Sequence, residues 1–197
     1  MKKILLLTLL CVLQTAMITA QTNVASLQYS VAFPTGKLND YVAKTSWRGL
    51  NFDYRAGVSD NFAAGFSAGY QLFYEKRSNA SVTEGTITLT GTQFRYINLV
   101  PVTVNATYYF NPGQIFSPYV GLGAGTIYRE NSLDVGLYSF TNESWHFALR
   151  PEAGLLYEPE PGVGLMFNVK YMNGFKTSKA AACNYFSVNT GIVWTWY

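Results

Sequence analysis

Apolar residues alternate with small or polar residues along most of the chain, and a period of two is typical of β-strands. From Phe62 to Tyr74 the even positions are Phe, Ala, Phe, Ala, Tyr, Leu and Tyr, whereas the odd positions are Ala, Gly, Ser, Gly, Gln and Phe. Seven more segments repeat this alternation, with apolar positions in 27–33, 52–58, 100–110, 120–124, 145–149, 165–171 and 186–196. The pattern predicts eight β-strands, and no segment shows a convincing helical period.

The connections between the predicted strands fall into two classes. Segments 59–61, 111–117 and 158–162 are turn-like, with proline and glycine as punctuation, whereas 34–46, 76–92, 130–144 and 173–183 are longer and more polar. If consecutive strands are antiparallel neighbours, the short connections lie at one end and the long ones at the other. Pro101 and Pro151 fall inside predicted strands, where each removes a ladder donor, so we expect a β-bulge at each.

The two faces of the predicted strands decide the class of protein. One face carries large apolar and aromatic side chains, and the other carries glycines and many of the charged residues. Eight strands enclose too little room for the apolar set, as a soluble barrel would require, whereas a membrane barrel turns that set outward. We therefore predict an all-β, eight-stranded, antiparallel up-and-down transmembrane β-barrel. Seven charged residues are expected to form a structural network in its lumen: Asp53, Arg55, Arg95, Arg129, Arg150, Glu152 and Lys170.

The expected network has a predicted geometry. Pairing across the 158–162 turn brings Glu152 close to Asn168 and diagonally near Lys170, with Arg150 one step above. Buried charges of mixed sign are tolerated when they are paired and hydrogen-bonded, which favours a plugged interior. The alternative is a selectivity ring in a conducting pore.

Aromatic residues gather near both ends of the predicted strands. Amphipathic rings favour the headgroup layer of a bilayer, so two belts one strand-length apart are expected. Near the long connections these are Trp47, Tyr74, Tyr128, Trp145 and Tyr171; near the short turns they are Phe62, Tyr108, Phe110, Tyr157, Trp194 and Trp196.

Composition and the first residues add the cellular context. Lys2 and Lys3, an apolar stretch over 4–13 and a small residue before Gln21 predict a signal peptide, residues 1–20, cleaved to leave a barrel domain over 21–197. An uncleaved anchor is disfavoured because the apolar stretch is shorter than a bilayer-spanning helix needs. Without the two leader lysines the chain has 12 basic and 11 acidic residues and no basic run, which disfavours nucleic-acid binding.

Catalytic and metal-binding patterns are weak. The one histidine, His146, has Ser144 two residues earlier on the same face. Lipid A deacylases of this size resemble a His-x-Ser arrangement on one strand, and the matching position here is Ala148. We interpret His146 as a rim residue in the headgroup layer beside Trp145. No residue is predicted to be catalytic or to bind a metal or cofactor.

Two segments and the carboxyl end carry a family resemblance. The runs SPYVGLGAG at 117–125 and LVPVTVNATYYF at 99–110 resemble the OmpA/OmpW-like outer-membrane β-barrel family, in the style of its Bacteroidetes members. In that family an aromatic last residue resembles the signal read by the barrel-assembly machinery, and Tyr197 matches it. Trp194 and Trp196 put Tyr197 out of phase with the outward series, so either the strand ends one residue early or a bulge intervenes.

The resemblance implies a Gram-negative outer membrane protein with short periplasmic turns and long extracellular loops. Its surroundings would be outer-membrane lipid and lipopolysaccharide, and the surface partner is unknown. We expect a non-enzymatic role in envelope structure or surface interaction through the loops, with a plugged polar lumen. Two alternatives stay open: an OmpW-like narrow channel for small or apolar solutes, and a lipid A-modifying enzyme that uses His146.

Overall fold

The computed structural model describes residues 22–84, 87–136, 138–178 and 180–196. The predicted signal peptide (1–20) and Tyr197 lie outside the described residues. In the described part of the chain, no helix is both long and apolar enough to cross a bilayer.

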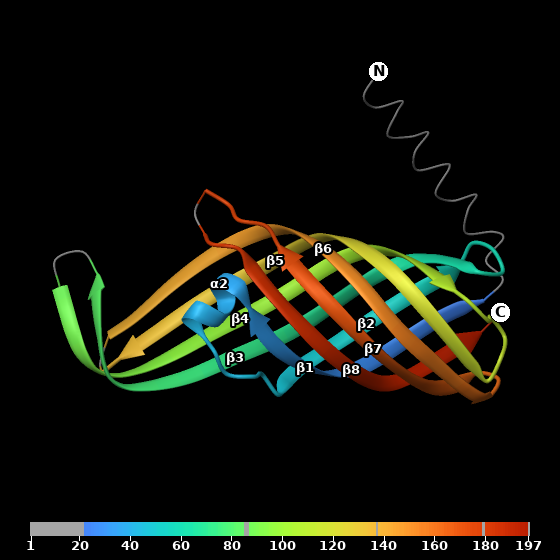
Figure 1. Cartoon of the computed structure of the whole chain (residues 1–197), viewed down its shortest axis with the longest axis horizontal. Helices are drawn as coiled ribbons and strands as arrows, with labels where there is room; N and C mark the ends of the chain where they lie inside the picture. The colour runs from blue at the N-terminus through green and yellow to red at the C-terminus, as the bar shows by residue number, and fades with distance from the viewer. Residues whose placement is uncertain (1–21, 85–86, 137, 179, 197) are drawn as a thin grey trace, which may run out of the picture.

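Eight antiparallel strands form a closed barrel in which each strand pairs with its sequence neighbours and β8 pairs with β1 (Figure 1). This confirms the predicted fold class. The elements are β1 (Asn23–Thr35), α2 (Gly36–Tyr41), β2 (Arg48–Gly57), β3 (Phe62–Glu84), β4 (Ile87–Tyr109), β5 (Phe116–Val135), β6 (Tyr138–Glu160), β7 (Val163–Gly174) and β8 (Cys183–Trp196). Closure leaves the barrel wall without a free strand edge.

The predicted facing of the strands is confirmed. Along β3, Phe66 and Tyr70 are exposed, while Ser67 and Gln71 beside them are buried. Val104, in the part of β4 that belongs to the barrel, is 68% exposed. Every strand contributes large apolar side chains to the outer face, among them Leu27, Phe52, Phe66, Val104, Leu122, Phe147, Phe167 and Ile192. Such a band is favourable against lipid and unfavourable against water.

The prolines do not produce the bulges expected at Pro101 and Pro151. On one side of each proline, pairing is continuous, with Ile127 opposite Pro101 and Leu122 opposite Pro151. On the other side the ladder skips two pairs and resumes in the same register. A proline removes a donor but adds no residue, so a gap in the ladder suffices and the facing is kept. Register shifts occur elsewhere, within 77–80 on β3 and 157–160 on β6.

The C-terminal register is regular over the described residues. Pairing of β8 with β1 runs without a shift from Asn184 opposite Thr35 to Trp196 opposite Asn23. Over the described residues β8 runs to Trp196, and no bulge precedes that residue.

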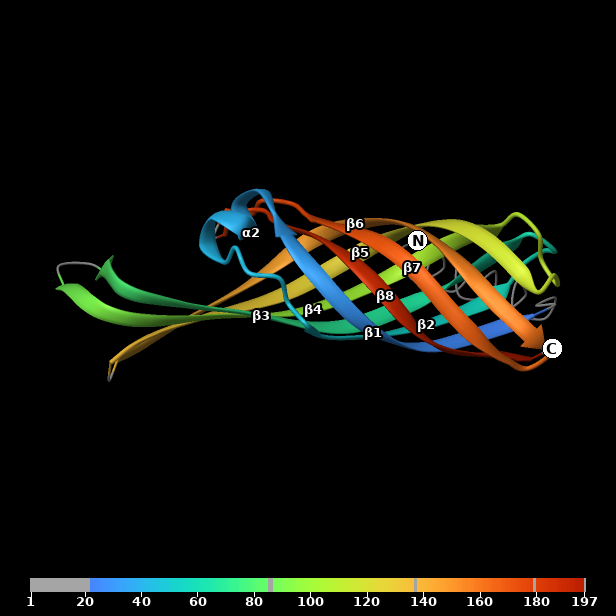
Figure 2. The ribbon, with the colours of Figure 1, turned by 60° about the horizontal axis from the view of Figure 1, so that its bottom comes forward.

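Two of the four long connections are strands rather than loops. Residues 76–84 and 87–92 extend β3 and β4, and 130–135 and 138–144 extend β5 and β6, as hairpins beyond the barrel (Figures 1 and 2). The 34–46 segment contains the helix α2, which was not expected. A six-residue helix with one buried side chain, Leu38, is too short to show a helical period.

The interior has three layers. At the hairpin end an apolar cluster joins Leu38 and Val42, at and just after α2, to wall residues such as Phe73 and Ile97. A second apolar cluster contains Tyr109, Tyr119, Leu156 and Met166 among others and lies toward the short turns. Many of the buried charged and amide side chains lie between these clusters.

Candidate functional site

The candidate site is the charged layer in the middle of the barrel. Asp53 and Arg55 stand two residues apart on β2, and Arg150 and Glu152 stand two apart on β6, so each pair points to the same side of its strand. Lys170 on β7 completes a set of three cations and two carboxylates. Each of the five side chains is no more than 3% exposed.

One ion pair crosses the barrel. Arg55 Nη2 donates to Glu152 Oε1 at 2.9 Å, although β2 and β6 stand four strands apart in a ring of eight. The same guanidinium reaches the hydroxyls of Tyr109 at 3.2 Å and Tyr119 at 3.4 Å, and its Cζ lies 4.4 Å from the centre of the Tyr119 ring. Opposite walls are thus in direct contact through charged side chains.

Asp53 is the second centre of the layer. Its Oδ2 accepts from Lys170 Nζ at 2.8 Å, from Gln28 Nε2 at 2.9 Å and from Arg55 Nη2 at 3.3 Å. Its Oδ1 lies 3.8 Å from Arg150 Nη1. A buried carboxylate needs this density of positive charge and donors, because desolvating it alone would be very costly.

A chain of amide side chains extends the layer around the wall. Asn168 Nδ2 donates to Gln28 Oε1 at 2.7 Å, and Asn189 Nδ2 donates to Asn168 Oδ1 at 2.8 Å. Asn51 Nδ2 then donates to Asn189 Oδ1 at 2.9 Å. On the other side, Arg150 Nη1 donates to Ser67 Oγ at 2.5 Å. All eight strands therefore contribute a polar side chain to one connected layer.

Glycines on β5 make room for the β6 charges. A Cβ on Gly121 would lie 2.9 Å from Glu152 Oε1, and a Cβ on Gly123 would lie 3.3 Å from Arg150 Nε. Glu152 and Arg150 pair with these two glycines in the ladder. The alternate glycines of β5 thus allow long charged side chains of the neighbouring strand to lie against the wall.

Two of the seven expected network residues lie apart from this layer. Arg95 donates to the Tyr41 carbonyl at 3.1 Å and stacks on the Tyr41 ring, at the hairpin end. Arg129 donates to Asn131 Oδ1 at 2.7 Å and to the Ala181 carbonyl at 3.4 Å. Sequence alternation gives the face of a residue but not its height in the barrel.

Two expected details of the pairing also change. Lys170 lies directly opposite Glu152 in the ladder, and Asn168 lies opposite Gly154, because the register shifts near the β6–β7 turn. Lys170 Nζ is 3.9 Å from Glu152 Oε2 but 2.8 Å from Asp53 Oδ2, so Asp53 is its principal partner. Tyr109, Tyr119 and Gln28 were not among the residues predicted for the network from the sequence. Their positions on the inward face of the alternating pattern were the signal that could have identified them.

His146 is shielded from water. Its side chain is fully buried and faces inward, with Nε2 3.1 Å from Ser144 Oγ and Nδ1 2.9 Å from the Phe175 carbonyl oxygen. Because a carbonyl only accepts, Nδ1 carries the proton and Nε2 accepts from Ser144. The expectation that His146 reaches water is therefore wrong, whereas its neighbour Trp145 is 63% exposed.

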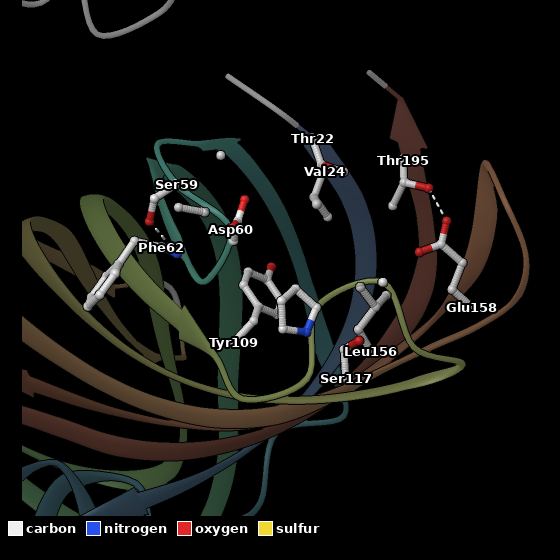
Figure 3. A pocket seen from close by; sticks show the side chains of 14 residues that line it. Thr22, Val24, Ser59, Asp60, Phe62, Tyr109, Ser117, Leu156, Glu158 and Thr195 are labelled. Carbon is white, nitrogen blue, oxygen red and sulfur yellow. Dashed lines mark hydrogen bonds between the residues drawn. The ribbon is translucent and has the colours of Figure 1, made fainter. Parts of the chain in front are cut away.

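The turn end of the barrel is hollowed. Figure 3 shows the hollow, into which Tyr109 and Leu156 project, with a hydrogen bond from Thr195 to Glu158 at its margin. Four lining residues, Val24, Ala63, Tyr109 and Leu156, belong to the apolar cluster beneath the charged layer. Among the described residues, no three His, Cys, Asp or Glu side chains are grouped as metal ligands.

A family comparison agrees with this geometry. Residues 4–194 match the outer membrane protein β-barrel domain. The chain belongs to this family. Membership implies location in the outer membrane, where the apolar outer band faces lipid. No curated protein matches the chain significantly.

Several solved structures resemble this chain in fold at low sequence identity. Neisserial surface protein A is 14% identical with a TM-score of 0.57, over 88% of this chain and 96% of that one. Ail, the attachment invasion locus protein of Yersinia pestis, is 15% identical with a TM-score of 0.52, over 89% and 97%. The N-terminal β-barrel domain of Pseudomonas aeruginosa OprF is 11% identical with a TM-score of 0.52, over 90% and 100%.

Proposed function

We propose that this protein is a closed, non-enzymatic outer-membrane barrel whose hairpins form an interaction surface and whose interior is a structural plug. The observation that carries the proposal is the Arg55–Glu152 ion pair, which spans the lumen between opposite strands at 2.9 Å. A pore-lining charge would face water and leave a path beside it. Here each charged group lies within 4 Å of an opposite charge at nearly complete burial.

The layers on either side support closure. Leu38 and Val42 are fully buried at the hairpin end, and the cluster with Tyr109 and Met166 lies beneath the charges. An ion would have to pass two apolar layers and break a buried ion pair, each of which is costly. These features favour the plug over the narrow-channel alternative.

The orientation follows from the same proposal. The β3–β4 and β5–β6 hairpins extend outside the cell among lipopolysaccharide molecules, and the short turns and the mature amino terminus lie in the periplasm. Residues 1–20 are removed on export, and Tyr197 guides insertion by the barrel-assembly machinery. The aromatic rings at the two ends, such as Tyr128 with Trp145 at 5.1 Å and Phe62 with Tyr108 at 4.9 Å, occupy the two headgroup layers.

Conductance in planar bilayers tests the plug. The wild-type protein should insert without ion conductance, whereas Arg55→Ala combined with Glu152→Ala should give brief openings, because removing both long side chains leaves only the two apolar layers across the lumen. Arg48→Ala, at an exposed position on the same strand as Arg55, is the matched control and should stay silent. Steady wild-type conductance that these substitutions leave unchanged would support the channel alternative instead.

One contact favours the enzyme alternative. Ser144 and His146 form a hydrogen-bonded pair with the Phe175 carbonyl behind the imidazole, which resembles a nucleophile with its base. His146 is fully buried and Ser144 is largely buried, which disfavours access of a lipid substrate to the pair. Lipid A mass profiles of cells with wild-type protein and with His146→Ala should be identical. A species lost with His146→Ala would establish lipid modification.

A further inference from the structure

Four strands continue past the barrel as an open sheet. The last β2–β3 pair is Arg48 with Leu72, and the last β6–β7 pair is Ala148 with Gly174. Beyond these pairs β3 still pairs with β4, β4 with β5 up to Val135, and β5 with β6 (Figure 1). The sheet therefore has two edges, β3 above Leu72 and β6 above Ala148.

The two edges have opposite character. On the β3 edge Lys76 and Arg77 carry positive charge, and a register shift follows within 77–80. The β6 edge from Tyr138 to Phe147 has no lysine, arginine or proline, and its pairing with β5 has no shift. Its outward charge is Glu143, which is exposed. Natural proteins usually blunt edges with lysine, proline or bulges, so the β6 edge is open to strand pairing.

Both edges present their backbone groups at matching positions. The Phe147 carbonyl accepts from Phe175 N–H on the β7 side, so by the alternation of a strand the groups of Trp145 and Glu143 point to the same edge. The Leu72 carbonyl accepts from Ser46 Oγ on the β2 side, which places the groups of Tyr74 and Lys76 at the β3 edge. Within the described ranges, no backbone hydrogen bond outside the β3–β4 and β5–β6 ladders uses these groups.

Strand direction allows two copies in one membrane to join. β3 runs from the short turns toward the hairpin end, and β6 runs the other way. Copies inserted with the same orientation therefore bring β6 of one and β3 of the next together antiparallel. Like edges, β3 with β3 or β6 with β6, would meet parallel.

The side chains fit in one register. Placing Tyr74 opposite Trp145 makes an outward aromatic pair at the lipid boundary and sets Lys76 opposite Glu143, since each charge lies two residues further from the barrel. All four side chains are exposed on the outer face. Opposite charges and aromatic pairs across strands are stabilising.

Among the described residues no cation lies within ion-pair distance of Glu143, whose carboxylate accepts a hydrogen bond from the Tyr128 hydroxyl. Its ladder partner on β5 is Glu130, another outward carboxylate, and like charges opposite each other are unfavourable. None of the ion pairs among the described residues includes Glu143, Glu130 or Lys76. A neighbour's Lys76 would supply the missing charge.

We propose that copies of this protein associate head to tail in the membrane, the β6 edge of one copy (Asn142–His146) pairing with the β3 edge of the next (Phe73–Arg77). The occupant of the open edge is a second copy. Its β3 edge has the complementary charge at Lys76, runs antiparallel to β6, and presents its backbone hydrogen-bonding groups at matching positions. The contact is heterologous, so it propagates into rows rather than closing as a dimer.

Cross-linking of full-length mature protein in outer membranes tests the pairing. Lys76→Cys combined with Glu143→Cys in one chain should yield a ladder of multimers under a mild thiol oxidant. Each single variant should remain monomeric, and a mixture of the two single variants should stop at dimers. The native Cys183 is fully buried and serves as background in the wild type. A retained mobility shift on heating shows that each variant is folded.

Folded double-cysteine protein without a ladder would overturn the proposal, and so would equal cross-linking of the single variants, which indicates random collision. Charge reversal is the second arm, read by energy transfer between labelled copies in proteoliposomes. Lys76→Glu or Glu143→Lys alone should lower transfer several-fold, and the two together should restore it. The control variants Lys37→Glu and Glu160→Lys lie away from both edges and should leave energy transfer unchanged. If they lower transfer as much as the edge variants do, the effect comes from net charge and not from a specific contact.

Discussion

At the scale of single residues, the charged side chains of the interior interact with one another in place of water. Asp53 and Glu152 lose water on folding and gain Lys170, Arg55 and Arg150 within 4 Å. Such an arrangement is tolerable only when it is complete, since one missing partner leaves a buried charge without compensation. The glycines of β5 are part of it, because they fix how close the β6 side chains can lie to the wall.

We expect Gly121→Leu to destabilise the barrel by about 1–3 kcal/mol, because the new side chain occupies the space of the Glu152 carboxylate. Ala124→Leu on the same strand faces outward and should change the free energy of unfolding by less than about 0.5 kcal/mol. Reversible urea unfolding in lipid vesicles measures both. Similar losses of unfolding free energy for Gly121→Leu and Ala124→Leu would mean that Glu152 does not pack against the glycines of β5.

At the scale of elements, the sequence predicted the strands well where each face meets a distinct medium. A period of two is strong when one face contacts lipid and the other the lumen, as along Phe62–Tyr74. Above the rim both faces of a hairpin meet water, so residues 76–92 and 130–144 lost the apolar signal although they are strands. The helix α2 and the burial of His146 depend on tertiary packing at the hairpin end, which alternation does not report.

The outward band gives a depth-dependent prediction. Val104→Arg, in the part of β4 that belongs to the barrel, should destabilise the protein in bilayers by about 2–4 kcal/mol, because the charge meets the hydrocarbon core. Val163→Arg, also outward but at the first residue of β7, should cost about 0–1 kcal/mol near the interface. Folding equilibria into bilayers decide this. Equal losses of folding free energy for Val104→Arg and Val163→Arg would contradict the expectation that Val104 faces the hydrocarbon core and Val163 lies near the interface.

At the scale of the whole molecule, the barrel is asymmetric between its ends. The helix α2 and the extended hairpins gather at one end, and the short turns gather at the other (Figure 2). Arg77 and Arg95 both donate to the Tyr41 carbonyl, and Ala43 N–H donates to Glu75 Oε2, so the segment at α2 is fastened to the hairpin wall.

Sidedness can be read with a membrane-impermeant thiol reagent. Ser78→Cys in the β3–β4 hairpin should be labelled on intact cells, because that hairpin is proposed to lie outside. Glu160→Cys at the β6–β7 turn should be labelled only after the outer membrane is opened. Both residues are exposed, so access depends on the membrane alone. The reverse pattern would invert the proposed orientation.

The central claim is that the interior ties opposite walls of the barrel together, and a double-mutant cycle on Arg55 and Glu152 tests it most directly. Each single substitution, Arg55→Met or Glu152→Gln, should lower the free energy of unfolding by about 3–5 kcal/mol. The combined variant should lose less than the sum, with a coupling of at least about 1 kcal/mol, while the exposed Lys37–Asp40 pair should give an additive cycle. Additive losses within about 0.5 kcal/mol for Arg55 and Glu152 would contradict the cross-barrel tie.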